Sequence, residues 1–207
     1  MHIKIVTILS IGILAASTAK AQSVLYSQPY NTTGNFTSSG PYTVYDDFTL
    51  SSGGTVNIVD WSGADLGGIK GFTVSFWSDN GGLPGTLLAS DNIIGSAGET
   101  PSGSDSDSRP IYNFSATLAS PFSAAPGTEY FLSIVANIGF CWVTSDVGNS
   151  GILQYEVGYT RIYWYHGMAF TLETVPEPGT IALGLFGASV FLFGRRNKRR
   201  FLANHAG

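Results

Sequence analysis

The chain has 207 residues, with 10 Lys and Arg against 14 Asp and Glu and a formal net charge of −4. Five of the basic residues lie between positions 195 and 200, so residues 22–174 hold three basic and thirteen acidic side chains, a balance of about −10. This balance argues against nucleic acid as a partner, because phosphate binding needs clustered Lys and Arg, and the single cysteine, Cys141, excludes an intramolecular disulfide.

Residues 1–21 have the pattern of a secretory signal peptide. Lys4 gives a positive start, residues 5–16 are almost wholly apolar, and residues 19–21 (AKA) match an A-x-A cleavage site. The alternative is an uncleaved N-terminal anchor, but the short apolar run that ends in small residues favours cleavage. We therefore expect a signal helix over residues 1–21 and a mature protein that begins near Gln22.

Residues 22–174 are predicted to form one all-β domain. Phe72, Val74 and Phe76 alternate with polar residues, which is the period of a half-buried antiparallel strand. No window of the segment has a helical period, and turn residues such as those at 79–82 separate the apolar runs. The pattern favours a single antiparallel β-sandwich of jelly-roll type, flanked by the signal helix and a C-terminal transmembrane helix. Further strands are expected at residues 42–50, 55–61, 112–118, 130–136, 140–145, 152–158, 161–165 and 168–172.

One stretch of this domain, residues 95–108 (GSAGETPSGSDSDS), is of low complexity. It has no large apolar residue, so we expect a mobile surface loop between strands, with Asp105 and Asp107 as solvated charges.

Residues 159–166 (YTRIYWYH) are the densest aromatic stretch and a candidate carbohydrate-binding site. In a strand, Tyr159, Arg161, Tyr163 and Tyr165 would share one face, and Trp164 would lie on the other. Pyranose rings stack on exposed aromatic faces, and tyrosine hydroxyls can form hydrogen bonds with them. The alternative is that these aromatics make ordinary strand-pairing and core contacts.

Adjacent acids give a second candidate site. Asp46 and Asp47 lie in an otherwise apolar strand and need partners there, so a structural calcium ion is an open hypothesis. The acid at position 79 belongs to an Asp-Asn-Gly-Gly sequence, which a hairpin turn explains better than a calcium loop. We predict no other cofactor.

The sequence gives little support for an enzyme. A glycoside hydrolase needs two carboxyls at a defined separation, and the spacing identifies no such pair. His166 is the only histidine within residues 22–174, which argues against histidine-rich zinc sites, and no G-x-S-x-G nucleophile elbow accompanies it. We therefore predict a non-enzymatic protein, with a carbohydrate-binding module as the alternative and a glycoside hydrolase as a weaker one.

Residues 175–200 combine three features in a fixed order. Val175, Pro176, Glu177 and Pro178 come first, and the prolines stop a preceding strand. Residues 180–194 form an uncharged apolar run, expected to be a transmembrane helix of roughly 22 Å. The hydrocarbon core is about 30 Å thick, but flanking arginines can snorkel, and a buried core helix is the alternative. The basic cluster that follows is expected to stay cytoplasmic; it consists of Arg195, Arg196, Lys198, Arg199 and Arg200.

This tripartite order resembles the PEP-CTERM sorting signal of Gram-negative bacteria. The resemblance implies that exosortase, a membrane-embedded processing protease, reads the tail, and that the chain is exported through the inner membrane and transiently anchored there by its C-terminal helix. Relatives are typically exported by strains that make exopolysaccharide, so it also implies a cell-surface or matrix location and an association with exopolysaccharide or biofilm. Residues 201–207 extend beyond the usual end of this signal and are expected to form a short cytoplasmic tail.

The domain before the tail also resembles exported sandwich domains that precede such signals. The similar phrases are residues 45–50 (YDDFTL), 72–85 (FTVSFWSDNGGLPG) and 127–134 (GTEYFLSI). These relatives have no established activity, so this resemblance implies the fold and leaves the function open.

Overall fold

Antiparallel strands make up all the regular structure in the computed structural model, which describes residues 22–31, 34–106, 108–148, 152–156, 159–163 and 167–175. Residues Gln22–Val175 form one compact unit. Within this described part, no helix has the length and apolar character needed to span a bilayer. The signal helix expected at residues 1–21 and the transmembrane helix expected at about 180–194 both lie outside the described residues.

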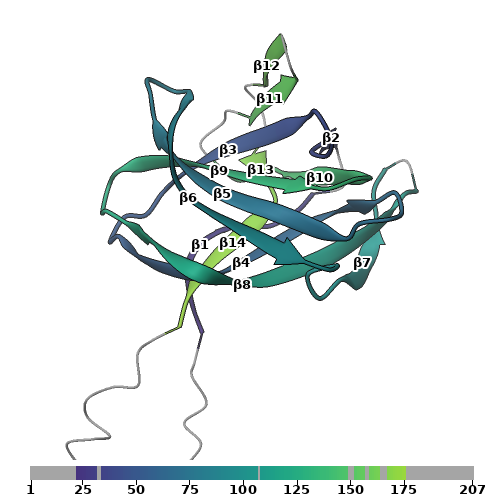
Figure 1. Ribbon diagram of the computed structural model, residues 1–207, viewed down its shortest axis with the longest axis horizontal. Helices are drawn as coiled ribbons and strands as arrows, with labels where there is room; N and C mark the ends of the chain where they lie inside the picture. The colour runs from purple at the N-terminus through teal and green to yellow at the C-terminus, as the bar shows by residue number, and fades with distance from the viewer. Residues whose placement is uncertain are drawn as a thin grey trace, which may run out of the picture. The chain divides into compact units, whose positions relative to one another are not determined.

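The strands form two sheets (Figure 1). Sheet I has eight strands, in which β1, β14, β4, β10 and β13 follow one another, β2 pairs with β10, and β8 pairs with β4 and β7. Sheet II has six strands in the order β12-β11-β3-β9-β5-β6. The bounds in sheet I are β1 (Ser23–Gln28), β2 (Asn35–Thr37), β4 (Gly54–Asp65), β7 (Thr100–Ser104), β8 (Pro110–Ala124), β10 (Phe140–Ser145), β13 (Gly167–Met168) and β14 (Phe170–Thr174). Those in sheet II are β3 (Thr43–Thr49), β5 (Gly71–Asp79), β6 (Pro84–Ile94), β9 (Glu129–Ala136), β11 (Ile152–Glu156) and β12 (Tyr159–Tyr163).

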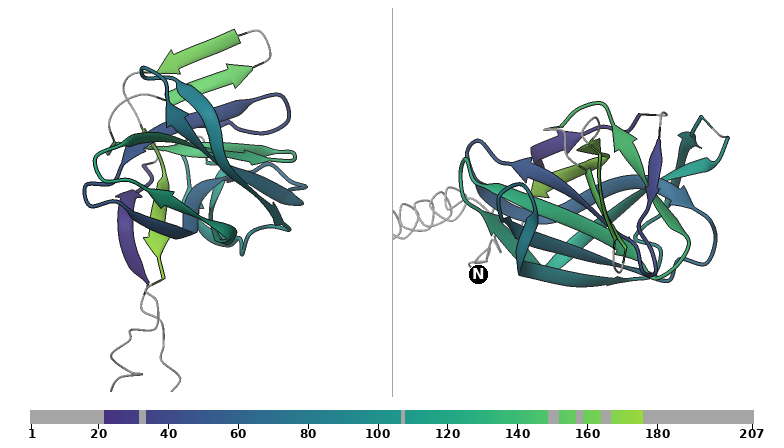
Figure 2. Two further views of the ribbon diagram at one scale, coloured as in Figure 1. Left: turned by 60° about the vertical axis from the view of Figure 1, so that its left-hand side comes forward. Right: turned by 90° about the horizontal axis from the view of Figure 1, so that it is seen from above.

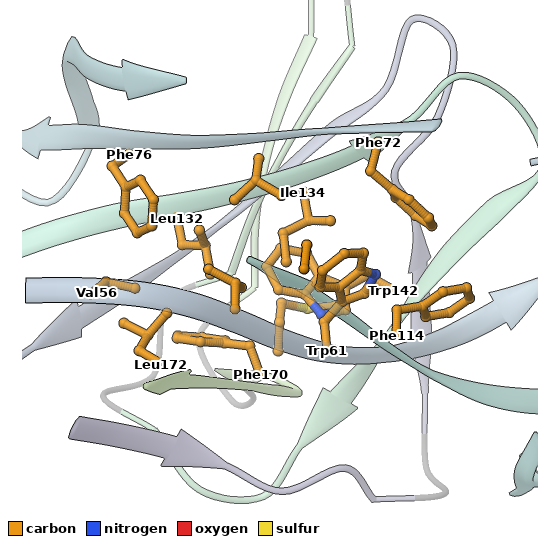
Figure 3. Packing of buried hydrophobic residues seen from close by; sticks show 14 of the residues in the cluster. Val56, Trp61, Phe72, Phe76, Phe114, Leu132, Ile134, Trp142, Phe170 and Leu172 are labelled. Carbon is orange, nitrogen blue, oxygen red and sulfur yellow. The ribbon is translucent and has the colours of Figure 1, made fainter. Parts of the chain in front are cut away.

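A large hydrophobic core lies between the two sheets, and a smaller buried cluster is separate from it. Figure 3 shows Phe72 and Phe76 of sheet II facing Trp61, Phe114 and Phe170 of sheet I. The alternation expected for β5 is confirmed, because its apolar positions are buried and contribute to this core. Two stacked sheets with a shared apolar interior are the arrangement predicted for a β-sandwich. The jelly-roll type stays a prediction.

Two of the four tryptophans are core residues. Trp142 is fully buried and its Nε1–H donates a 2.9 Å hydrogen bond to the Ala169 carbonyl oxygen. Trp61 is 2 % exposed and stacks on Phe114 at 5.7 Å, but its Nε1 has no hydrogen-bond partner among the described residues. An unpaired buried donor loses its hydration without compensation.

We therefore expect Trp142→Phe to destabilise the protein more than Trp61→Phe, by about 1 kcal/mol. Both changes remove the same indole atoms from a buried site, but only the first removes a formed hydrogen bond. Denaturant unfolding of the two variants measures the difference. Equal decreases in the free energy of unfolding, or a larger decrease for Trp61→Phe, would contradict the assignment of Trp61 Nε1–H as an unpaired donor.

The stretch expected to be a mobile loop, residues 95–108, contains a strand instead. β7 pairs with β8, with Thr100 opposite Asn113, and Ala97 is buried. The Ser115 N–H also donates to the Ala97 carbonyl oxygen at 2.8 Å. The loop expectation was wrong because sheet pairing uses backbone groups, and small residues can supply these without any apolar pattern.

Three further strands had no sequence signal. β2 has only three residues, and the sequences of β1 (SVLYSQ) and β6 (PGTLLASDNII) do not alternate between apolar and polar residues, although half-buried and exposed side chains alternate from Leu88 to Ile94. The turn between β5 and β6 is confirmed: the Asp79 carboxylate accepts from the N–H groups of Gly81 and Gly82, both of which have positive φ. Positive φ at these two positions is what glycine permits.

The two ends of the described domain lie side by side. β1 and β14 are antiparallel neighbours, and Ser23 pairs with Thr174 (Figure 1). β14 also pairs with β4, so it lies inside sheet I with a neighbour on each side. The first residue of the expected sorting motif, Val175, therefore follows a strand that is paired on both edges.

Candidate functional site

A polar cleft of about 410 Å³ lies on the outer face of sheet I. We define this polar cleft by Ser27, Tyr30, Asp60, Asn113, Ser115 and Thr171, which line it together with some of their chain neighbours and with residues 98 and 100. Its volume falls within the range of natural small-molecule sites.

Strand alternation and pairing build this surface. Trp61 and Phe114 face the core, so their neighbours Asp60 and Ser115 face outward. The register places Ser115 opposite Asp60 and Asp60 opposite Thr171. Ser27 follows on β1, opposite Thr171. Polar side chains from four strands thus form one row across the sheet.

Hydrogen bonds order the surroundings of the row. The Ser27 and Thr171 hydroxyls are 2.8 Å apart, and the Ser62 hydroxyl donates to Asn113 Oδ1 at 2.8 Å. Above them, the Tyr30 hydroxyl donates to the Ser102 carbonyl oxygen of β7 at 3.1 Å. The segment that was expected to be a mobile loop therefore holds Tyr30 in place at the cleft.

Only one of the residues that line the cleft is ionisable as an acid or base at neutral pH. Burial raises the pKa of Asp60, and a hydrogen bond from Ser115 opposes this shift. Burial also raises the pKa of the adjacent Glu173, and the charge of Asp60 adds to the effect. The lining contains no Lys or Arg, so the local field is negative.

The acids suspected of holding calcium are both buried. Asp46 is 1 % exposed and Asp47 is 5 % exposed, and the Met168 N–H donates to Asp46 Oδ2 at 2.7 Å. With the Gln28 amide oriented to satisfy its neighbours, its nitrogen lies 3.1 Å from Asp46 Oδ2 and its oxygen accepts from the Tyr26 hydroxyl at 2.7 Å. Asp46 thus belongs to a buried network of hydrogen bonds.

The described residues contain no group of three or more His, Cys, Asp or Glu side chains arranged to hold a metal ion. A structural calcium ion at Asp46 and Asp47 stays a prediction, with protein oxygens as its ligands. A melting temperature that EDTA leaves unchanged would contradict it.

Burial strongly raises the pKa of Asp46, with a further contribution from the charge of Asp47. Burial also raises the pKa of Tyr26 to about 12. A carboxyl whose pKa is higher in the folded state than in the unfolded state binds its proton more tightly when folded. Its contribution to stability is therefore greatest at low pH and falls as the pH rises from the unfolded value towards the folded one.

We therefore expect the melting temperature to be higher near pH 5 than near pH 8. The pKa values of Asp60, Glu99, Glu129 and Glu173 are also raised, so their contributions have the same sign. Calorimetry across this range measures the slope.

In this experiment, Asp46→Asn should make the slope shallower, because the substituted side chain no longer titrates. Ser52→Ala, which removes an exposed hydroxyl and no titrating group, is the control and should leave the slope unchanged. A wild-type melting temperature that rises from pH 5 to pH 8 would contradict the sign of the effect.

The candidate carbohydrate-binding strand lies at the edge of sheet II. Tyr159 and Tyr163 belong to β12, opposite Glu156 and Ile152 of β11. Figure 2 shows this hairpin extending beyond the other strands of the sheet. The side chains of β12 lie outside the described part of the structure, as do Trp164 and Tyr165. A sugar-binding row on this strand therefore stays a prediction.

Of the four residues predicted to form the sorting motif, Val175 alone lies among the described residues. Val175 is half-buried, and its N–H donates to Asn57 Oδ1 at 3.0 Å. Pro176, Glu177 and Pro178 lie outside the described residues, as does the basic cluster from Arg195 to Arg200. The role of Asn57 had no sequence signal, because it depends on the pairing of β14 with β4.

Comparison with known proteins identifies the tail. The family model of the PEP-CTERM protein-sorting motif matches residues 174–200, and no curated protein matches the chain. The matched region covers the Pro-Glu-Pro sequence, the apolar run and the basic cluster, in agreement with the resemblance found in the sequence. It begins at Thr174, the last residue of β14. The chain thus carries a PEP-CTERM protein-sorting motif, which implies export, transient membrane anchoring and processing by exosortase.

Proposed function

We propose that this chain is a non-enzymatic cell-surface or extracellular-matrix protein whose β-domain associates with exopolysaccharide, as in a biofilm. The observation that carries the proposal is the sorting motif placed directly after β14. A protein delivered by this route meets the extracellular polymer once the membrane anchor is removed. The acidic balance of residues 22–174 suits a solvated extracellular domain.

The second candidate function is that of a carbohydrate-binding module, and the polar cleft favours it. Hydroxyl and amide groups in a row can exchange hydrogen bonds with sugar hydroxyls. A glycoside hydrolase is less well supported at this place, because Asp60 is the only carboxyl among the residues that line the cleft and the reaction uses two.

The test compares an exopolysaccharide-producing host with an isogenic strain that lacks polymer synthesis. Association predicts that the processed protein stays with the cell-surface or matrix fraction in the first strain and moves into the medium in the second. Fractionation followed by immunoblotting measures this distribution. The same distribution in both strains would overturn the association and leave the sorting assignment intact.

A further inference from the structure

We propose that the polar cleft of sheet I binds a neutral hexose unit of a polysaccharide. This inference rests on the proposed association with exopolysaccharide and gives it a site. The cleft volume, about 410 Å³, is sufficient for a sugar ring with its hydroxyls and some of its water.

The order of polar groups across the strands supports this ligand class. Ser27, Thr171, Asp60 and Ser115 follow one another on adjacent strands, and Asn113 lies beside Ser115 along β8. The Ser27 and Thr171 hydroxyls bond to each other at 2.8 Å and keep acceptor lone pairs for a ligand. Hydroxyl groups donate and accept, the amide does both, and the carboxylate accepts, so the row can satisfy a ring of hydroxyls in mixed orientation.

Tyr30 and Pro29 supply an apolar part of the lining. The hydrogen bond from the Tyr30 hydroxyl to Ser102 fixes this side chain before any ligand arrives, which lowers the entropy lost on binding. An aromatic ring next to a polar row is a common arrangement for sugars, because one face of a pyranose is apolar and its rim is polar.

Charge decides between neutral and anionic sugars. Asp60 lines the cleft, Glu173 is near enough for the two charges to interact, and the lining has no cation. A uronic acid, sulfate or phosphate group would therefore enter a negative field without a partner for its own charge. Neutral units can use Asp60 as a hydrogen-bond acceptor, and bonds to a charged acceptor are stronger than neutral ones.

The experiment titrates the full-length protein in detergent with dextran, a neutral hexose polymer, and with alginate, an anionic one, by affinity electrophoresis. The same gels are run with the exopolysaccharide of the host. Binding of dextran, or of the host exopolysaccharide where that polymer is neutral, is expected, and binding of alginate should be at least tenfold weaker. Equal or stronger binding of alginate, or no binding of any polymer, would overturn the proposal.

Two variants locate the site. Asp60→Asn together with Asn113→Ala should weaken binding at least tenfold, because the change removes a charged acceptor and an amide from the cleft. Asn92→Ala, which removes an exposed amide bonded to Thr73 on sheet II, is the control and should bind as the wild type does. If the double variant binds as strongly as the wild type, the cleft is not the binding site. This result would leave the association with exopolysaccharide intact if the fractionation experiment supports it.

A separate observation concerns the start of the sorting motif. Asn57 Oδ1 accepts from the Val175 N–H at 3.0 Å and from the Thr174 hydroxyl at 3.2 Å. Asn57 lies at a register shift of the β4–β8 pair, between Val56 and Ile58, and such irregularities redirect side chains. The Asn57 side chain therefore forms hydrogen bonds with Thr174 and Val175, the first two residues of the matched motif.

We infer that Asn57 slows exosortase processing by holding the start of the motif against sheet I. A protease needs its substrate extended and unpaired, and only residues 176–179 separate Val175 from the start of the apolar run. Four residues span at most about 14 Å, so a bound Val175 limits how far the motif can move from the domain. Release of Thr174 and Val175 would lengthen this reach.

Pulse-chase labelling of the full chain in an exosortase-containing host tests the inference. Asn57→Ala is expected to be processed at least twofold faster than the wild type, whereas Asn57→Asp keeps an acceptor oxygen and should restore the wild-type rate. An unchanged or lower rate for Asn57→Ala would overturn the inference. A wild-type chain that is never processed would instead contradict the sorting assignment itself.

Discussion

Replacing Val175, Pro176, Glu177 and Pro178 with alanine is expected to leave the full-length chain unprocessed in the membrane. The match to the sorting motif begins at Thr174, and these four residues lie in the part of it that precedes the apolar run. Alanine favours a helix and proline disfavours one, so the substitution would let the helix expected at residues 180–194 begin earlier, and the protease would meet a different backbone. The wild type should instead yield a shorter product that leaves the membrane fraction.

The position of Val175 makes this experiment specific. Its contact with Asn57 uses the backbone N–H, which alanine retains, so the end of β14 should remain in place. Ser51→Ala with Ser52→Ala, in the exposed turn between β3 and β4, is the control and should be processed normally. Immunoblots of membrane and medium fractions give the result. Equal processing of the motif variant and the wild type would contradict the assignment of these residues.

The sandwich core could be predicted because its signal is local. Phe72, Val74 and Phe76 alternate with polar residues within a single strand, and such a pattern specifies a buried face without knowledge of the neighbours. The strand predicted at residues 140–145 has the same bounds as β10. Its two faces are both buried, so it was recognised from its apolar run and the turn residues around it.

The polar cleft could not be predicted, because its signal is not local. Ser27, Asp60, Ser115 and Thr171 are spread over most of the domain, and only the register of four strands places them in one row. Each of them is an ordinary outward-facing polar residue of its own strand. The aromatic stretch at residues 159–166 attracted the binding hypothesis instead, because aromatic density can be seen without any pairing.

The same reason explains the wrong expectation for Asp105. A run of Ser, Gly and Asp is typical of solvated loops, and Asp107, its neighbour in that run, lies outside the described residues. Asp105, however, has a side chain that is only 2 % exposed, and Asn35 of β2 donates to its Oδ2 at 3.1 Å. This partner is seventy positions away in the sequence, so no local pattern could indicate it.

Asp105→Ala is accordingly expected to destabilise the domain by about 2–4 kcal/mol, a large loss for one residue outside the main core. The Asp105 carboxylate accepts from the Arg109 N–H at 2.8 Å and from Arg109 Nε–H at 2.9 Å, besides the bond from Asn35. These bonds fasten the turn between β7 and β8 to β2. The Arg109 side chain is 37 % exposed and can regain water, so the loss comes mainly from the buried donors.

Thermal unfolding is the measurement, and a lowering of the melting temperature by roughly 5–15 °C is the expected size for a domain of this length. Asp105→Asn should cost less, because an amide oxygen can still accept from the Arg109 N–H while the ion pair is lost. Arg109→Ala should also cost less, since the carboxylate keeps its bonds from Asn35 and the backbone. A variant Asp105→Ala that melts at the wild-type temperature would show that the Asp105 carboxylate is solvated. The turn between β7 and β8, β7 itself and the Tyr30 side of the polar cleft would then not depend on this carboxylate.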